Sequence, residues 1–408
     1  MRKKFFKILM PFFMSAVLLA GCQAAPEVSK DDEILRAKGS SEDEIEAIVQ
    51  EDGESGTAGI QEEDVAAESG AQGDSRDAEP VSIVLGSGES RMRIEAEIAA
   101  VPEAMSTLTM QADSRLREET LRSFLEPQGE VKDFTEELLA EEEAERQRVA
   151  EIDEKLGEGN SMIEIAGVGD GSRLALTDGN RKAVFVGGTG GSYEDAALME
   201  KCYAVAKEEA QKVDVKKENG GDVSFSLQDA KDLLMSRLSV LGIEDIYLIE
   251  AYFYEDNGFS VYEVQFCPVV YGMPVAYCFG QEDISKVYPR GVAWVSEEGV
   301  AEIGMWNCLM EQVSATEKEK ILSFDKVQKL LETYLKDGSL YCVEDVPFST
   351  VELVYFVEQK DNVLELVPMW NIHMEPEEYV EYTGEVGSND FNWTVYIDAV
   401  TGELVAAQ

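Results

Sequence analysis

The sequence is poor in the residues from which catalytic and nucleic-acid-binding sites are built. It holds one histidine, His373, among 408 residues, and 35 basic residues against 82 acidic ones. Any Ser-His-Asp, Cys-His or histidine-bearing zinc site would need His373, which lies at the end of a predicted strand. The acidic excess argues against nucleic acid as a partner, because nucleic-acid binding requires a basic surface. We therefore predict no catalytic residue, no metal site and no cofactor, and a protein that is not an enzyme.

Cysteine is also scarce, and none of the cysteines forms a CxxC pair. Five remain after Cys22, namely Cys202, Cys267, Cys278, Cys308 and Cys342. Most lie in apolar segments, which predicts small buried side chains. The alternative is one disulfide across a hairpin, between Cys267 and Cys278.

The chain has one long apolar run, residues 8–20, which follows four basic residues at the N-terminus. A basic start and a run of this length are typical of a secretory signal. The run is shorter than the roughly 20 residues that span a bilayer. No second run follows, which predicts a tethered rather than a membrane-spanning protein.

The run ends in Leu19-Ala20-Gly21-Cys22, which resembles the lipobox of bacterial lipoproteins. The resemblance implies that signal peptidase recognises Leu19, Ala20 and Gly21, and that membrane lipid is attached to Cys22. The expected location is the cell membrane, lipid-anchored on its extracytoplasmic face, with residues 1–21 as the signal peptide. An ordinary signal peptide with a chance cysteine, or an uncleaved anchor, remains the alternative.

Residues 22–85 are predicted to be a disordered acidic linker. Between Pro26 and Pro80 there are 18 acidic and four basic residues and no aromatic residue. Such a segment cannot bury enough apolar surface to offset the entropy of ordering it. A short helix over 42–50 is the one element expected there. Because residues 1–21 hold four of the basic residues and no acidic one, the remaining chain has a formal charge of −51.

Residues 86–220 are predicted to be an N-terminal α+β region. Helices are expected over 114–125 and 132–156, and short strands over 93–101, 173–176 and 183–186. The glycine-rich stretch 187–192, before a helix expected from Tyr193, imitates a phosphate-binding loop. It lacks the lysine that such loops use, so we interpret it as a flexible strand-to-helix connection.

The C-terminal half contains an internal repeat. The segment 226–234 opens a helix with a capping serine, Ser226, and 323–331 does so again at Ser323. Apolar residues fall at the same offsets in both segments. We predict two tandem units, 221–312 and 313–408, each with a helix packed on an antiparallel sheet.

Each helix is followed by two expected strands and a closing hairpin. The strands are 247–254 and 259–266 in the first unit, and 351–357 and 363–369 in the second. Tyr252-Phe253 is matched with Tyr355-Phe356, and Pro268 with Pro368. The closing hairpins are expected to turn at Gly299 and Gly402. The predicted fold class is α+β.

The last hairpin, with Asp398-Ala399-Val400-Thr401-Gly402, resembles the end of PepSY-type domains. The segment 271–275 is similar to the Gly-hydrophobic-Pro segment of PepSY-like domains, and 367–370 to the Pro-x-Trp strand of the YycH and YycI regulators. The layout resembles clostridial-type Gram-positive lipoproteins of unassigned function. These resemblances cover about 180 residues and imply a regulatory or contact role. Asp398, Thr401 and Gly402 are interpreted as structural turn residues, as is Gly299.

Three functions remain open. The first is a lipid-anchored, non-enzymatic interaction or regulatory protein that binds a protein or peptide partner at the outer membrane face. Its contact residues would be aromatic side chains of an acidic, glycine-rich loop: Tyr379, Tyr382, Phe391 and Trp393. The second is a cell-envelope protein that binds a cation or a small solute. The third is a hydrolase with an unrecognised site. Acidic pairs such as Glu297-Glu298 are too abundant to indicate acid/base chemistry.

Overall fold

The structure is a computed structural model that describes residues 48–49, 79–88, 90–113, 117–156, 172–187, 189–207, 210–215, 225–276, 289–342, 344, 347–360, 363–374 and 393–407. Residues 1–22, with the predicted signal and lipobox, lie outside these ranges. No helix in the described ranges is long and apolar enough to cross a bilayer.

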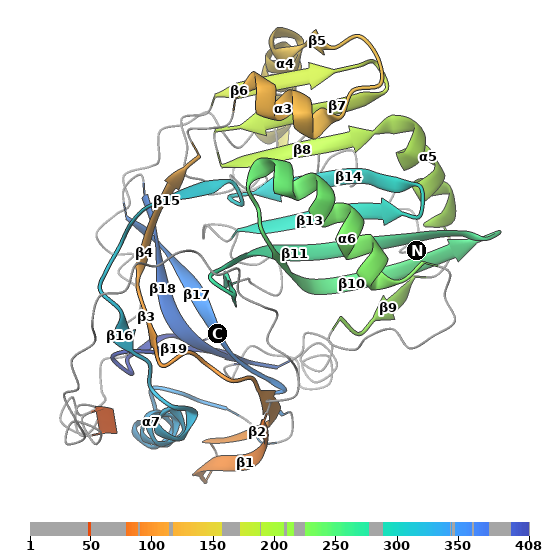
Figure 1. Cartoon of the computed structure of the whole chain (residues 1–408). Helices are drawn as coiled ribbons and strands as arrows, with labels where there is room; N and C mark the ends of the chain where they lie inside the picture. The colour runs from red at the N-terminus through yellow and green to blue at the C-terminus, as the bar shows by residue number, and fades with distance from the viewer. Residues whose placement is uncertain are drawn as a thin grey trace, which may run out of the picture.

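The largest of the antiparallel sheets contains ten strands. They are β5 (Lys132–Asp133), β6 (Arg173–Thr177), β7 (Arg181–Val186), β8 (Gly190–Asp195), β9 (Gln211–Val213), β10 (Ile246–Asp256), β11 (Phe259–Val270), β12 (Met273–Pro274), β13 (Arg290–Ser296) and β14 (Gly299–Trp306). Their order is β5-β6-β7-β8-β14-β13-β11-β10-β9, with β12 paired to β11. Figure 1 shows the long strands β10, β11, β13 and β14 side by side. β-Branched and aromatic residues dominate the long strands, as expected for a pleated surface buried on both faces.

The smaller sheet contains six strands. They are β4 (Leu108–Ala112), β15 (Met310–Ala315), β17 (Thr350–Lys360), β18 (Val363–His373), β19 (Thr394–Asp398) and β20 (Leu404–Ala407). β18 pairs with β17 along its length, and its other edge is shared by β4 and β19. Two ribbons complete the strands: β1 (Glu79–Ser87) with β2 (Ser90–Ile98), and β3 (Ala104–Met105) with β16 (Glu319–Lys320).

Helices cover the sheets. They are α3 (Glu118–Leu125), α4 (Thr135–Leu156), α5 (Ala196–Val205), α6 (Leu227–Leu238), which continues into a 3-10 turn (Ser239–Leu241), and α7 (Phe324–Asp337). Val261 packs with α5 whereas its neighbour Tyr262 packs with α6. Since neighbouring strand residues point to opposite faces, α5 and α6 lie on opposite faces of the large sheet. The fold is α+β, as predicted.

The two C-terminal units share one topology. In the first, α6 precedes β10, β11, β13 and β14, which are neighbours in that order. In the second, α7 precedes β17, β18, β19 and β20, again neighbours in chain order. Figure 1 shows α6 lying across the strands of its sheet. A helix followed by a four-stranded meander therefore occurs twice, although the two meanders belong to different sheets.

The two helix starts differ. Ser226 caps α6: its hydroxyl accepts from the Asp229 backbone N–H, and the Asp229 carboxylate accepts in return from the Ser226 backbone N–H. Ser323 occupies the N-cap position of α7, but its side chain makes no capping hydrogen bond. The prediction of a capping serine is therefore wrong for the second unit. Phe324, the first residue of that helix, is partly buried and packs against the Trp370 ring, with centroids 5.6 Å apart.

The register of the hairpins corrects the residue matching between the units. The pairs nearest the turns are Asp256 with Phe259 and Lys360 with Val363. Five residues after Phe259 is Val264, and five residues after Val363 is Pro368. Pro368 therefore corresponds to Val264 and not to Pro268. Tyr252-Phe253 is likewise one residue out of step with Tyr355-Phe356, because sequence similarity in short aromatic strands does not fix their register.

The predicted N-terminal region, 86–220, is not a separate domain. Strands β5 to β9 extend the sheet of the first unit, whereas β4 joins β15 and β18 beside the second. Hydrogen bonds between distant strands decide this partition, and local sequence patterns carry no information about them. The large sheet crosses the predicted boundary at 220, and its strands on both sides share one core.

The predicted linker is also shorter than 22–85 at its C-terminal end. β1 begins at Glu79 and pairs with β2. Within the predicted helix over 42–50, Ile48 and Val49 are helical and pack against the core around α7. Lys326 on α7 donates to the Val49 carbonyl at 2.9 Å. The rest of the predicted linker lies outside the described residues.

The second half of the glycine-rich stretch is part of a strand and not a flexible connection. Residues 190–192 begin β8, which pairs with β7 and β14. A side chain at Gly190 would lie 2.8 Å from the Met305 carbonyl, and one at Gly191 would lie 2.8 Å from the Val184 carbonyl. The glycines therefore allow close approach of neighbouring strands. The following helix begins at Ala196 rather than Tyr193.

Candidate functional site

The predicted turn residues bond within their own hairpins. Asp398 Oδ1 accepts from the backbone N–H groups of Val400 and Thr401, both at 2.8 Å. Gly402 has φ +77°, and a Cβ there would lie 2.8 Å from Leu330 Cδ1. Thr401 Oγ1 accepts from the Glu403 backbone N–H at 3.3 Å. In the other closing hairpin Gly299 has φ +136°. These observations give the four predicted residues, Asp398, Thr401, Gly402 and Gly299, a role in the turns.

The predicted aromatic contact loop is described only at its end. Tyr379, Tyr382 and Phe391 lie outside the described residues, as do Leu19, Ala20, Gly21 and Cys22. Trp393 is described and is partly buried against the core around α7. Its carbonyl accepts from the Met374 backbone N–H at 3.0 Å. Trp393 therefore packs on the small sheet.

The histidine and the described cysteines are buried. His373 is 1% exposed at the end of β18. Cys202, Cys267, Cys308 and Cys342 are buried free thiols. Burial raises the pKa of Cys202, Cys308 and Cys342 to about 12, so these thiols are poor nucleophiles at neutral pH. Cys278, and with it the predicted disulfide, lies outside the described residues.

A group of acidic and aromatic side chains gathers on the face of the large sheet that α5 covers. We call it the acidic–aromatic cluster, and define it by six residues: Glu194, Tyr203, Tyr254, Glu263, Trp294 and Glu302. Strand register places four of them in one row across the sheet. Glu194 pairs with Glu302, Glu302 with Trp294, and Trp294 with Glu263. Direct partners in antiparallel strands point to the same face, so these side chains are neighbours.

A β-bulge lies next to Glu302. Trp294 pairs with Glu302, but the next residue, Val295, pairs with Val300, which leaves Ala301 as an extra residue. Val300 packs on the α6 face, whereas Ala301 packs on the α5 face with Trp294. Bulges change the direction of neighbouring side chains. This bulge leaves both Ala301 and Glu302 on the face of α5.

Three aromatic rings line the cluster. Trp294 stacks on Tyr254 with ring centroids 5.5 Å apart, and Tyr203 tilts against Trp294 at 6.1 Å. Tyr254 donates to Glu263 Oε2 at 2.9 Å. Trp294 is 2% exposed and its indole Nε1 has no hydrogen-bond partner, whereas Tyr203 is 41% exposed. The cluster thus reaches from the buried indole to the surface at Tyr203.

The carboxylates repel one another. Burial, followed by Glu194 and Glu263, raises the pKa of Glu302 from 4.5 to about 7. Burial also raises the pKa of Glu263, against the hydrogen bond from Tyr254, and Glu250 adds to the rise. Burial and the three cluster carboxylates raise the pKa of the Tyr203 hydroxyl to about 12. The charges of Glu194, Glu263 and Glu302 therefore act on the Tyr203 hydroxyl.

Basic side chains lie at the ends of the row and not at its centre. Lys182 pairs with Glu194 at one end and is exposed. At the other end, Lys212 bonds to Glu250 at 3.4 Å. Lys201 on α5 forms an ion pair with Glu298 at 2.6 Å, beyond the row. In the described part of the chain, the row holds no basic residue from Glu194 through Glu302 to Glu263.

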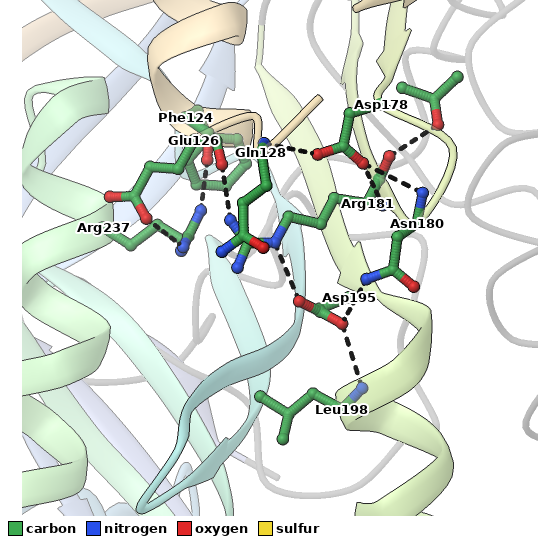
Figure 2. A network of polar contacts seen from close by, with 10 residues as sticks. Phe124, Glu126, Gln128, Asp178, Asn180, Arg181, Asp195, Leu198 and Arg237 are labelled. Carbon is green, nitrogen blue, oxygen red and sulfur yellow. Dashed lines mark hydrogen bonds and ion pairs between the residues drawn. The ribbon is translucent and has the colours of Figure 1, made fainter. Parts of the chain in front are cut away.

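A separate polar network fixes the position of α5 (Figure 2). Asp195, next to Glu194 on β8, caps α5 by accepting from the Leu198 backbone N–H at 3.1 Å. Arg181 Nε and Asn180 Nδ2 both donate to the Asp195 carboxylate, at 2.9 and 3.0 Å. These contacts lower the pKa of Asp195, although burial opposes them. They hold the helix that carries Tyr203.

The network continues to the end of α3. Arg181 Nη1 donates to the Glu126 carbonyl at 2.6 Å, and Arg237 Nη1 on α6 donates to the Phe124 carbonyl at 2.5 Å. The Arg237 guanidinium lies 4.0 Å from the centre of the Tyr193 ring. Arginine side chains satisfy carbonyls that a helix end leaves free and complement its dipole. This network connects α3 and α6 to strands β7 and β8, and through Asp195 to the start of α5.

Sequence reasoning did not find the acidic–aromatic cluster. With 82 acidic residues in the chain, the positions of single carboxylates do not indicate a site. A usable signal lies in two strands, where Glu263 and Glu302 interrupt the apolar segments 261–264 and 300–303. A glutamate within an apolar strand is uncommon because burial of a charge is costly. A glutamate in each of these strands indicates two unusual positions. It does not indicate that the two side chains lie close together.

The arrangement offers negative charge beside aromatic faces, which is the chemistry that attracts cations. In the described ranges no three His, Cys, Asp or Glu residues are grouped closely enough to hold a metal ion.

Comparison with known proteins yields structural likenesses alone, one of which is described here. No protein-family model and no curated protein matches the chain. An uncharacterized protein from Eubacterium rectale has a crystal structure that is similar with a TM-score of 0.48 and 14% sequence identity. The match covers 82% of this chain and 96% of that chain. At these values the likeness carries no argument about function, and the chain is placed in no family.

Proposed function

We propose that this chain is a lipid-anchored, extracytoplasmic protein without enzymatic activity. It binds a protein or peptide partner at the outer face of the cell membrane through the acidic–aromatic cluster. The lipobox resemblance at Cys22 supports the location, and the PepSY-like resemblance of residues 226–408 supports a contact role. Membrane lipid on the acylated Cys22 is then its second partner.

One observation carries the proposal: three partly buried carboxylates share one sheet face without a basic residue among them. Like charges directly opposite each other destabilise a sheet. Perturbed carboxylates gathered at one place are typical of functional sites. A partner that brings positive charge to this face relieves the repulsion, which gives the binding its driving force.

The test is affinity capture with the full chain from detergent-solubilised membranes. We compare the native chain, a Glu263→Gln/Glu302→Gln double variant, and a Glu137→Gln control on the exposed surface of α4. The proposal expects one specific protein to be recovered with the native chain and the control but not with the double variant. Equal recovery by all three chains, or no specific protein with any, contradicts it.

A cell-envelope cation- or solute-binding protein is the second candidate. The carboxylates beside aromatic rings favour it for a small organic cation, which needs only the cluster and not a wider contact surface. Thermal shift of the native chain against calcium and a panel of small amines distinguishes the two. A large shift with a small cation, together with no captured protein, favours the second candidate.

A further inference from the structure

We infer that the acidic–aromatic cluster is a site for an organic cation, the guanidinium or ammonium group of a basic side chain. The inference rests on the proposed function, because it names the chemical group through which the partner is recognised. The residues that carry it are the six of the cluster.

The first step is the absence of a basic residue between the three carboxylates of the row, since Lys182 pairs with Glu194 only at its outer end. Glu194 and Glu302 are direct partners on neighbouring strands, and Glu263 is separated from Glu302 by Trp294 alone. The charged groups that raise the pKa of Glu302 are both acidic, Glu194 and Glu263. A bound cation at this place stabilises the ionised form of all three carboxylates.

The second step is the unpartnered indole. Trp294 is 2% exposed, lies between Glu302 and Glu263 in the row, and has an Nε1–H without a hydrogen-bond partner. Buried indole N–H groups usually find an acceptor. A ligand that supplies both a cation and a nearby oxygen, as a peptide does through its carbonyl, satisfies the carboxylates and the indole together.

The third step is the nature of the cation. Tyr203, Tyr254 and Trp294 present aromatic rings beside the carboxylates. Aromatic rings attract organic cations through their negative faces, most strongly when the rings are shielded from water. A guanidinium also stacks on such rings while it donates to carboxylates. The mixture of rings and carboxylates therefore suits a lysine or arginine side chain.

The test is isothermal titration of the full chain, held in a non-denaturing detergent, with blocked tripeptides. The probes are N-acetyl-Gly-Arg-Gly-amide, its lysine analogue and its glutamine analogue. Agmatine serves as a free guanidinium- and amine-bearing compound without a peptide backbone, and calcium chloride as an inorganic cation. We expect one-to-one binding of the arginine and lysine peptides and none of the glutamine peptide.

Variants then assign the binding to the cluster. Glu263→Gln/Glu302→Gln should weaken the arginine peptide by about tenfold or more, and Trp294→Phe by severalfold, whereas Glu137→Gln leaves it unchanged. Circular dichroism of each variant checks the fold, and the peptide comparison on the native chain needs no variant. Agmatine binding as tightly as the arginine peptide supports the site and shows that a small free organic cation binds without a peptide backbone.

Two results overturn the inference. One is binding of calcium in place of the organic cations, and the other is equal affinity of the native chain and the double variant for the arginine peptide. Either result leaves the capture experiment to decide the proposed function separately. A captured partner that depends on the cluster, with no peptide binding, shows that the function stands and that this ligand class is wrong.

Discussion

Glu194 on β8 and Glu302 on β14 are direct cross-strand partners, so two carboxylates face each other on the covered side of the large sheet. A cross-strand pair of this kind has Cβ atoms roughly 5 Å apart, and like charges there are destabilising. Sheets normally place opposite charges or apolar residues at such positions. The pair therefore costs stability, which is one of the reasons we propose this face as a binding site.

The first prediction concerns pH and Glu302. Its pKa is raised from 4.5 to about 7, so between these values the folded chain holds a proton that the unfolded chain has released. Stability therefore falls as the pH rises from about 4.5 to 7. Glu302→Gln removes this loss. Because each pKa unit corresponds to about 1.4 kcal/mol and solvent screens a partly exposed side chain, we expect a gain of about 1–3 kcal/mol at pH 8.

Urea unfolding of the full chain at pH 5 and pH 8 checks this prediction. At pH 5 native Glu302 is mostly protonated, and the variant and the native chain should have nearly the same stability. Glu137→Gln, on an exposed helix face, should change neither value. A variant that is less stable than the native chain at pH 8 would show that Glu302 is stabilised as a carboxylate.

The second prediction concerns Arg237. Its guanidinium is buried, donates to the Phe124 carbonyl and to Glu126 Oε2 at 2.7 Å, and lies on the Tyr193 ring. Arg237→Ala leaves the carbonyl without this donor and opens a cavity under α6. We expect a loss of about 2–4 kcal/mol in the free energy of unfolding.

Glu126→Gln is the matched control for Arg237. The Glu126 carboxylate is more than half exposed. Exposed ion pairs contribute about 0–1 kcal/mol, so this variant should be close to the native chain in the same unfolding experiment. Equal losses for the two variants would show that the ion pair, and not the buried arginine, stabilises this network.

The third prediction compares two glycines with positive φ. Gly402 and Gly258 have φ +77° and +81°, but only Gly402 has neighbours at the position of a Cβ. Gly258→Ala should cost about 1 kcal/mol from backbone strain alone. Gly402→Ala adds the clash with buried Leu330, for an expected total of about 2–4 kcal/mol.

Thermal unfolding of both glycine variants measures the difference between them. Equal losses of stability in the two variants would show that α7 can shift at Leu330, away from the closing hairpin. That result is not expected, because the Tyr334 hydroxyl donates to the Gly402 carbonyl at 2.7 Å and ties the helix to this turn.

The fourth prediction concerns the anchor. Cys22→Ser removes the only residue to which the lipobox resemblance attaches lipid. The chain should move from the membrane fraction to the soluble exported fraction, while urea unfolding of the folded part stays unchanged. Metabolic labelling with a fatty acid measures acylation directly. A native chain that takes up no label, or a variant that stays in the membrane, contradicts the lipoprotein proposal.

Much of the fold follows from local sequence. Helices at 227–238 and 324–337 follow from apolar spacing, because one face of a helix must be buried. The closing hairpins follow from glycines that accept positive φ. The repeated order of a helix and four strands follows as well. The predicted correspondence of Pro268 in the first unit with Pro368 in the second unit was wrong. The alternation of strand residues has a period of two and does not specify the register between strands.

The sequence alone determined the classes of element, the acidic character of the chain and the lipobox pattern, since each depends on residues that are adjacent or nearly so. Only the tertiary structure decided that strands β4 to β9 belong to two different sheets. It also decided that Glu194, Glu263 and Glu302 lie in one row with Trp294. These residues come from strands far apart in the chain. Pairing between distant strands is set by the packing of the whole core, and no local pattern encodes it.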